Sequence, residues 1–116
     1  IINRRVRLYL AEDMVHTPDE VSRWLTHWYG RSFATLEELL ASSDAKGKFC
    51  HGDTPTVADI FLVSLLSAAQ VFDVDVSGFS TLMKIEAVCL ELPQFQDKLP
   101  RLLYTPLVSG PRLQSR

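Results

Sequence analysis

The stretch TVADIFLVSLLSAAQVF, residues 56–72, decides the fold of this chain. Thr56 and Asp59 have the spacing of a capping box, in which the Thr56 hydroxyl accepts from the Asp59 N–H and the Asp59 carboxylate accepts from the Thr56 N–H. The helix that follows, Val57 to Phe72, carries one charge, that of Asp59. Because a helix that is apolar on all sides is buried on all sides, we predict a central helix here. We expect Thr56 and Asp59 to be structural.

Two segments upstream of this helix have helical periodicity. The first spans residues 2–14, and its shared apolar face consists of Ile2, Val6, Tyr9, Leu10 and Met14. Its arginines are expected to face away from the core: Arg4, Arg5 and Arg7. The second begins at residues 17–20, which offer a threonine cap, a proline at the first helical position and acids in the first turn. It fades at residues 42–44, and its apolar stripe consists of Val21, Leu25, Trp28, Leu36, Leu39 and Leu40.

Downstream, residues 73–78 are expected to form a loop. A third stripe follows, which consists of Phe79, Leu82, Ile85, Val88, Cys89 and Leu92. Pro93 ends it, and residues 94–99 are at most a short helix. We therefore predict an all-α fold, a bundle of four to five helices around a buried central helix. The domain covers residues 1–103, and residues 104–116 are an irregular tail.

Composition excludes several classes of function. The net charge is −2 and no basic stripe stands out, so no nucleic acid partner is expected. The longest apolar stretch, residues 60–69, is too short for a bilayer, which takes about 20 apolar residues, so no membrane partner is expected. The histidines and cysteines have no metal-site spacing. We interpret Cys50 and Cys89 as reduced thiols of a cytoplasmic protein.

Several motifs together point to a known family. They are Trp24-x-x-His27-Trp28, Phe33-x-x-Leu36-Glu37-x-x-Leu40, Phe49-Cys50-x-Gly52-Asp53-x-Pro55-Thr56-x-Ala58-Asp59, Phe72-x-Val74-Asp75 and Cys89-x-x-Leu92-Pro93-x-Phe95. This pattern resembles the C-terminal half of the zeta-class glutathione transferases, the maleylacetoacetate isomerase type. The chain begins with Ile-Ile-Asn rather than Met, which suggests an internal fragment, or an unusual start, of something longer.

The resemblance implies a helical domain that follows a thioredoxin-like, glutathione-binding domain. The parent enzyme would use glutathione as cosubstrate to isomerise a cis double bond in tyrosine breakdown, or to act on small haloacids. Its first helices would pair across a homodimer. In this family the catalytic serine-cysteine motif and the glutathione-binding residues lie in the first domain. We therefore expect no catalytic residue, no bound cofactor and no metal in this chain, and no catalysis by the chain alone.

Departures from the family pattern concern the acceptor-substrate side. Val71 stands where the family has an arginine that helps to hold the acidic substrate, and Leu65 and Ala68 stand where it often has glutamine and asparagine. These positions lie three apart and so share one side of a helix. With Tyr9 they are the candidate wall of the substrate pocket. A carboxylate substrate would lose a charge-assisted hydrogen bond worth about 1.5–3 kcal/mol, so we expect a more apolar acceptor pocket or no catalysis.

Other interpretations stay open at this point. A noncatalytic assembly module of the same fold is the alternative function, and the apolar replacements are compatible with it. Tyr9 is expected to pack in the core, and a place in the wall of the substrate pocket is the second possibility. Trp24 and Trp28, one turn apart, are expected to pack in the core or line a groove, and His27 to be a packed or surface histidine. An apolar face left by an absent domain is rarely exposed to water, which predicts a dimer or larger assembly of the isolated chain.

Overall fold

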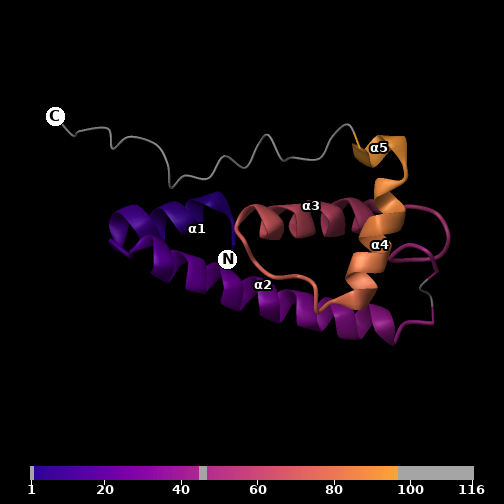
Figure 1. Cartoon of the computed structure of the whole chain (residues 1–116), viewed down its shortest axis with the longest axis horizontal. Helices are drawn as coiled ribbons and strands as arrows, with labels where there is room; N and C mark the ends of the chain where they lie inside the picture. Colours follow the sequence, from indigo (N-terminus) through magenta and orange to yellow (C-terminus); the bar gives the residue numbers. More distant parts are fainter. Residues whose placement is uncertain (1, 45–46, 97–116) are drawn as a thin grey trace.

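The computed structural model describes residues 2–44 and 47–96. These residues form α1 (Arg4–Leu8), the π-helix η1 (Tyr9–Asp13), α2 (Pro18–Ala41), α3 (Val57–Val71), α4 (Ser80–Leu90) and α5 (Pro93–Gln96), with no strand among them (Figure 1). The prediction of an all-α bundle is confirmed. None of these helices is long and apolar enough to cross a membrane. The irregular tail predicted for residues 104–116 lies outside the described residues.

The first segment differs from the single helix predicted for residues 2–14. It is divided into α1 and the π-helix η1, in which the Met14 N–H donates to the Tyr9 carbonyl at 2.9 Å. Because a π-helix holds more residues per turn than an α-helix, the face of the segment shifts at this point. Of the predicted face Leu10 is buried, whereas Tyr9 is 57% exposed, so its assignment to the core was wrong.

The burial of Arg7 was also not expected. Arg4 and Arg5 are exposed as predicted, but Arg7 is only 8% exposed. Its guanidinium carbon lies 4.3 Å from the centre of the Phe72 ring, at the end of α3. A guanidinium stacked on an aromatic face is held by a cation–π interaction, and its aliphatic stem covers apolar surface. This contact joins the first segment to α3.

The long helix α2 begins and ends as the sequence predicts. A capping box joins Thr17 to Glu20, with the Thr17 N–H donating to the Glu20 carboxylate at 2.8 Å, and the Ser42 hydroxyl donates to the Glu38 carbonyl at 2.8 Å. The core side of the helix consists of Leu25, Tyr29, Phe33 and Leu40. Leu39, placed in the predicted stripe, is instead 61% exposed. The predicted stripe does not include Tyr29 and Phe33, so its face is rotated relative to the buried side of α2.

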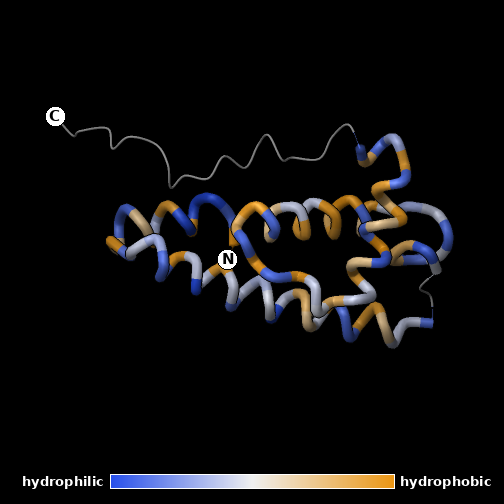
Figure 2. The backbone as a smooth tube through the Cα atoms, in the orientation of Figure 1, coloured by the Kyte–Doolittle hydropathy of each residue, from blue (hydrophilic) through white to orange (hydrophobic). Residues whose placement is uncertain are grey.

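Helix α3 has a buried side, which includes Asp59, Leu62, Val63 and residues 66–69, and an exposed side near its start. Its residues Leu66 and Ala69 are 0% exposed, and they pack with residues from α2 and α4 such as Phe33 and Leu82. Figure 2 shows hydrophobic residues along most of α3. However, the first turn exposes three large apolar side chains, and these are Val57 at 66%, Ile60 at 56% and Phe61 at 65%. The prediction of burial on all sides was wrong here, because no described residue covers that side of the helix.

A single carboxylate on α2 holds the start of α4. Glu37 Oε1 accepts from the Thr81 N–H at 2.8 Å, and Glu37 Oε2 accepts from the Leu82 N–H at 3.0 Å. The residue before α4, Phe79, makes no side-chain cap, so Glu37 fills that place from another helix. Burial alone raises the pKa of Glu37, but these hydrogen bonds outweigh it and leave the pKa below its ordinary value. The negative charge also suits a helix N-terminus.

Candidate functional site

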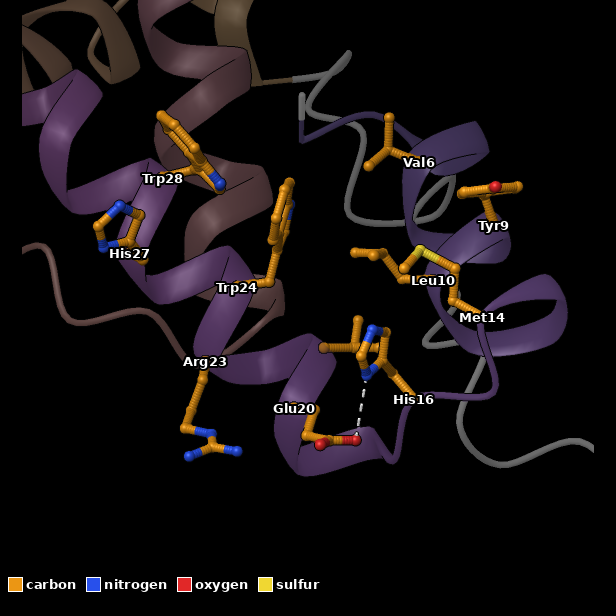
Figure 3. Close-up of a pocket in the computed structure, with 11 residues that line it drawn as sticks. Val6, Tyr9, Leu10, Met14, His16, Glu20, Arg23, Trp24, His27 and Trp28 are labelled. Carbon is orange, nitrogen blue, oxygen red and sulfur yellow. Dashed lines mark hydrogen bonds and ion pairs between the residues drawn. The ribbon is translucent and has the colours of Figure 1, made fainter.

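A cavity of about 790 Å³ lies between α1 and η1 on one side and the first half of α2 on the other (Figure 3). Its volume is in the range of about 300–1,000 Å³ that is typical of small-molecule sites. The side of α1 and η1 contributes Val6, Tyr9, Leu10 and Met14. The facing side contributes His16, Glu20, Val21, Arg23, Trp24, His27 and Trp28.

The connection between the two sides is short and conformationally unusual. After η1, the His16 N–H donates to the Leu10 carbonyl at 2.9 Å. Val15 has a φ of 56° and is 79% exposed. A β-branched residue in the left-handed region is an outlier, because its side chain crowds the backbone there. The chain reverses at this residue and enters α2 at Thr17, which sets the two walls of the cavity against each other.

The α2 wall is aromatic. The ring centres of Trp24 and Trp28 lie 5.7 Å apart with the ring planes at 58°, and His27 meets Trp28 edge-on at 5.0 Å. Residues four apart lie on one face of a helix, so both indoles are presented to the cavity. The Nε1 atom of Trp24 is shielded from water and has no hydrogen-bond partner among the described residues, a state that costs about 1–3 kcal/mol for a buried donor. The tryptophans therefore line a groove, one of the two places predicted for them.

The charges at the rim are not equivalent. The Glu20 carboxylate accepts from the Thr17 N–H at 2.8 Å and the Thr17 hydroxyl at 3.1 Å, and it pairs with His16 Nδ1 at 3.3 Å. The Thr17 N–H is the largest cause that lowers the pKa of Glu20, followed by the Thr17 hydroxyl and His16. By contrast, Arg23 makes no ion pair among the described residues. Arg23 is exposed, and Figure 3 shows its side chain extending away from the two tryptophans and from the α1–η1 side of the cavity.

The four predicted wall residues do not all line this cavity. Only Tyr9 lines the cavity. Leu65, Ala68 and Val71 lie on α3, outside it, and Ala68 is 2% exposed within the core. Leu65 and Val71 are half-buried. The role of these four residues as an acceptor-pocket wall stays a prediction.

Sequence reasoning missed the cavity, although part of its signal was present. Val6, Leu10 and Met14 share the apolar face predicted for the first segment, and Trp24 and Trp28 are one turn apart on α2. The apolar pattern of the sequence does not indicate the π-helix, which shifts the direction of the apolar face of the first segment.

The buried carboxylate at the start of α3 is held in a hydrogen-bond network. Asp59 is 0% exposed, and its Oδ2 accepts from the Thr56 N–H at 2.7 Å and the Thr56 hydroxyl at 2.9 Å, while its Oδ1 accepts from the Cys50 N–H at 2.8 Å. Burial raises the pKa of Asp59, but the hydrogen bonds from Cys50 and Thr56 outweigh it and leave the pKa lowered. Every one of these contacts is internal to the fold.

The described residues offer neither a metal site nor an activated thiol. No group of three or more histidine, cysteine or acidic side chains that could hold a metal ion occurs among them. Both cysteines are free. Burial raises the pKa of Cys50 to about 12, with Asp59 adding to the effect, and burial raises that of Cys89 to about 11. Because the thiolate is the nucleophile, neither cysteine is primed for chemistry at neutral pH.

Comparison with known proteins gives a consistent set of similarities. The family model for the glutathione S-transferase C-terminal domain matches residues 18–103. Maleylpyruvate isomerase of Ralstonia sp is 33% identical over 100 residues, which is 86% of this chain and 47% of that protein. A holo structure of maleylpyruvate isomerase, a bacterial zeta-class glutathione S-transferase, is similar at a TM-score of 0.77 and 33% identity, over 81% of this chain and 44% of that one.

A second solved structure adds a ligand. Maleylacetoacetate isomerase of Methylobacterium extorquens AM1, with bound malonate and glutathione, is similar at a TM-score of 0.74 and 29% identity, over 78% of this chain and 42% of that one. The chain spans about half the length of the curated relatives it matches.

Proposed function

The chain belongs to the glutathione S-transferase C-terminal domain family, and on that premise we propose that it is the acceptor-substrate and dimerisation domain of a glutathione-dependent transferase or cis–trans isomerase. The observation that carries the proposal is the family match over residues 18–103, together with the similarity to zeta-class isomerases. In this proposal glutathione is bound by a thioredoxin-like domain, and the helical domain supplies the wall for the second substrate in the cytoplasm.

The acceptor substrate is proposed to be more apolar than a dicarboxylate. Leu65 and Val71 are half-buried apolar residues on α3, and Val71 is the last residue of that helix. An arginine at this place would offer a charge-assisted hydrogen bond to a carboxylate, whereas valine offers only apolar contact. The isomerases of similar sequence act on maleylpyruvate or maleylacetoacetate by name, so the proposed difference lies in substrate preference.

The first test concerns the coding region upstream of Ile1. If this region encodes a thioredoxin-like domain with a serine-cysteine motif, the proposal is supported. If it does not, an enzymatic function of this gene product is excluded. The complete product would then be assayed with glutathione against maleylpyruvate and against an apolar chlorinated aromatic acceptor. We expect turnover of the aromatic acceptor. The variant Val71→Arg should raise kcat/KM for maleylpyruvate, while Gln70→Arg, at an exposed neighbour, should not.

The alternative is a noncatalytic assembly module of the same fold. The open first turn of α3, with Val57, Ile60 and Phe61 exposed, is the observation that favours it, because a contiguous apolar surface indicates a protein contact. The two proposals differ in one measurable respect. A complete gene product that binds no glutathione and turns over no acceptor supports the module.

A further inference from the structure

We propose that two copies of this chain exchange their first segments, residues 2–14, so that the segment of each copy packs on α2 of the other. The inference rests on the dimerisation proposed above and names how the second copy binds. In such a domain-swapped dimer the contacts of the segment are kept, and only its connection to α2 changes conformation. Three features of the chain support this exchange: a strained connection, a light attachment of the segment and a rigid start of α2.

The connection between the segment and α2 is short and strained. Only residues 15 and 16 separate Met14, the C-cap of η1, from Thr17, the N-cap of α2. Val15 has a φ of 56°, and this left-handed conformation crowds the side chain of an L-residue, above all a β-branched one. Its side chain is 79% exposed, so burial does not offset this cost. Opening the connection relieves the strain once in each copy, and short strained connections favour exchange.

The segment is attached lightly to the rest of its own chain. Leu10 is only 7% exposed, yet it lies outside the hydrophobic core cluster, and Ile2 is the one apolar residue of the segment that packs against that cluster. Other contacts are those of η1 with α2 beside the cavity, where Figure 3 shows Leu10 directed toward Trp24, and the stacking of Arg7 on Phe72. The segment of a second copy presents the same surface and can make the same contacts.

The start of α2 confines the change to residues 15 and 16. Pro18 is the first residue of α2, and Thr17 before it is extended, with a ψ of 158°. A residue that precedes proline is disfavoured in the helical region, and a proline inside a helix clashes with the preceding turn. The segment and α2 therefore do not fuse into one helix when the connection opens. The capping box between Thr17 and Glu20 stays on α2, and the segment is free to reach another copy.

A face-to-face dimer is the competing arrangement. In it two closed copies would bury exposed residues of the segment such as Tyr9 and Met14. The φ of Val15 stays unchanged in that arrangement, so the affinity does not depend on the connection. The exchanged dimer is favoured because it alone relieves the strain in both connections. Substitutions of Val15 therefore distinguish the two arrangements.

The first experiment measures the dimer dissociation constant of this chain by analytical ultracentrifugation. Glycine adopts a positive φ without strain, so Val15→Gly favours the closed monomer and should raise the dissociation constant at least about thirty-fold. Proline fixes φ near −65° and cannot adopt the closed conformation, so Val15→Pro should shift the chain to the dimer. Asp73→Gly is the matched control, because Asp73 is exposed and has the same φ of 56°. It should change the dissociation constant less than about two-fold.

Mixing two variants tests the exchange without altering the connection. Leu10→Glu damages the segment, and Trp28→Glu damages the side of α2 that receives it. In the heterodimer one pairing is intact, because the unaltered segment of one copy meets the unaltered α2 of the other, whereas neither homodimer has an intact pairing. Native mass spectrometry should therefore show more heterodimer than random association gives. Circular dichroism checks that each variant is folded.

The outcomes separate the mode of dimerisation from dimerisation itself. A monomer at every concentration would overturn both the exchange and the proposed dimerisation role. A dimer whose dissociation constant is unchanged by Val15→Gly and Val15→Pro, or a heterodimer at its random share, would overturn the exchange alone. Equal effects of Val15→Gly and Asp73→Gly would also overturn it, because the cause would then be general stability and not the connection.

Discussion

Replacing Asp59 by alanine should remove a large part of the stability of the fold. The Asp59 carboxylate joins the connection before α3 to the helix itself, because it accepts from the Cys50 N–H at 2.8 Å and from the Thr56 N–H at 2.7 Å. It also accepts from the Thr56 hydroxyl at 2.9 Å. The side chain is 0% exposed, so water does not readily replace it in the folded state.

The size of the stability loss follows from the hydrogen-bond donors that lose the Asp59 carboxylate as their acceptor. Two backbone N–H groups lose their acceptor, at about 1–2 kcal/mol each for part-buried groups. Loss of the hydrogen bond from the Thr56 hydroxyl and of the negative charge at the start of α3 adds about 1 kcal/mol. Asp59→Ala should therefore lower the free energy of unfolding by roughly 3–5 kcal/mol, out of a total of about 5–15 kcal/mol typical of a domain.

Urea denaturation followed by circular dichroism measures this change. Asp53→Ala is the matched control, since Asp53 is exposed and accepts one hydrogen bond from the Lys48 N–H at 3.1 Å, and it should cost less than about 1 kcal/mol. Asp59→Asn, which keeps one acceptor oxygen, should lie between the two. A loss for Asp59→Ala no larger than that for Asp53→Ala would refute the reasoning.

The same carboxylate gives the fold a dependence on acid. The pKa of Asp59 is lower in the folded state than its ordinary value, because its hydrogen bonds outweigh the effect of burial. A group with a lowered folded pKa contributes stability above its unfolded pKa, and this contribution is lost as the pH falls through the folded pKa. The wild-type chain should thus lose stability on acidification more steeply than Asp59→Ala. Parallel acid profiles for the two proteins would contradict the assignment.

Three further predictions concern the rest of the chain. Glu37→Gln keeps the size of the side chain but loses the charge at the start of α4, so it should cost about 1–2 kcal/mol in urea denaturation, whereas the exposed neighbour Glu38→Gln should be neutral within error. Cys50 and Cys89, with pKa values raised to about 12 and about 11, should react with iodoacetamide at pH 7 at least about tenfold more slowly in the folded chain than in urea, and equal rates would exclude their protection. Light scattering should give a homodimer or larger assembly, and a clean monomer at high micromolar concentration would exclude it.

Features whose partners lie close in the sequence could be predicted from it. The Thr56 and Asp59 contact spans three residues, as does the cap between Thr17 and Glu20, so the residue types and their spacing are sufficient. The start of α2 and of α3 and the all-helical class follow from these signals and from the apolar periodicity.

Features that join distant parts of the chain could not be predicted in this way. The sequence predicts Arg7 to be one of three solvated arginines, because nothing nearby in the sequence indicates that its guanidinium stacks on the ring of Phe72. Glu37 meets Thr81 across a separation of 44 residues. The cavity combines both kinds of feature: its tryptophans are one turn apart on α2, but part of its facing wall is a π-helix, which has no signal in the apolar pattern.

The open first turn of α3 shows a different limit. The sequence of this helix is apolar throughout and predicts burial, yet Ile60 and Phe61 are exposed in the described part of the chain. Apolar composition indicates that a face is to be covered and does not indicate by what. An additional domain and a second copy of the chain satisfy the composition equally well.

The most direct test of the proposed division of labour is a calorimetric titration of glutathione into this chain, with an assay on a chlorinated aromatic acceptor beside it. We predict no binding and no turnover, because the glutathione site is assigned to a thioredoxin-like domain and no thiol or metal centre is primed among the described residues. Binding in the micromolar range, about −8 kcal/mol, would place a glutathione site on the helical domain and contradict that assignment.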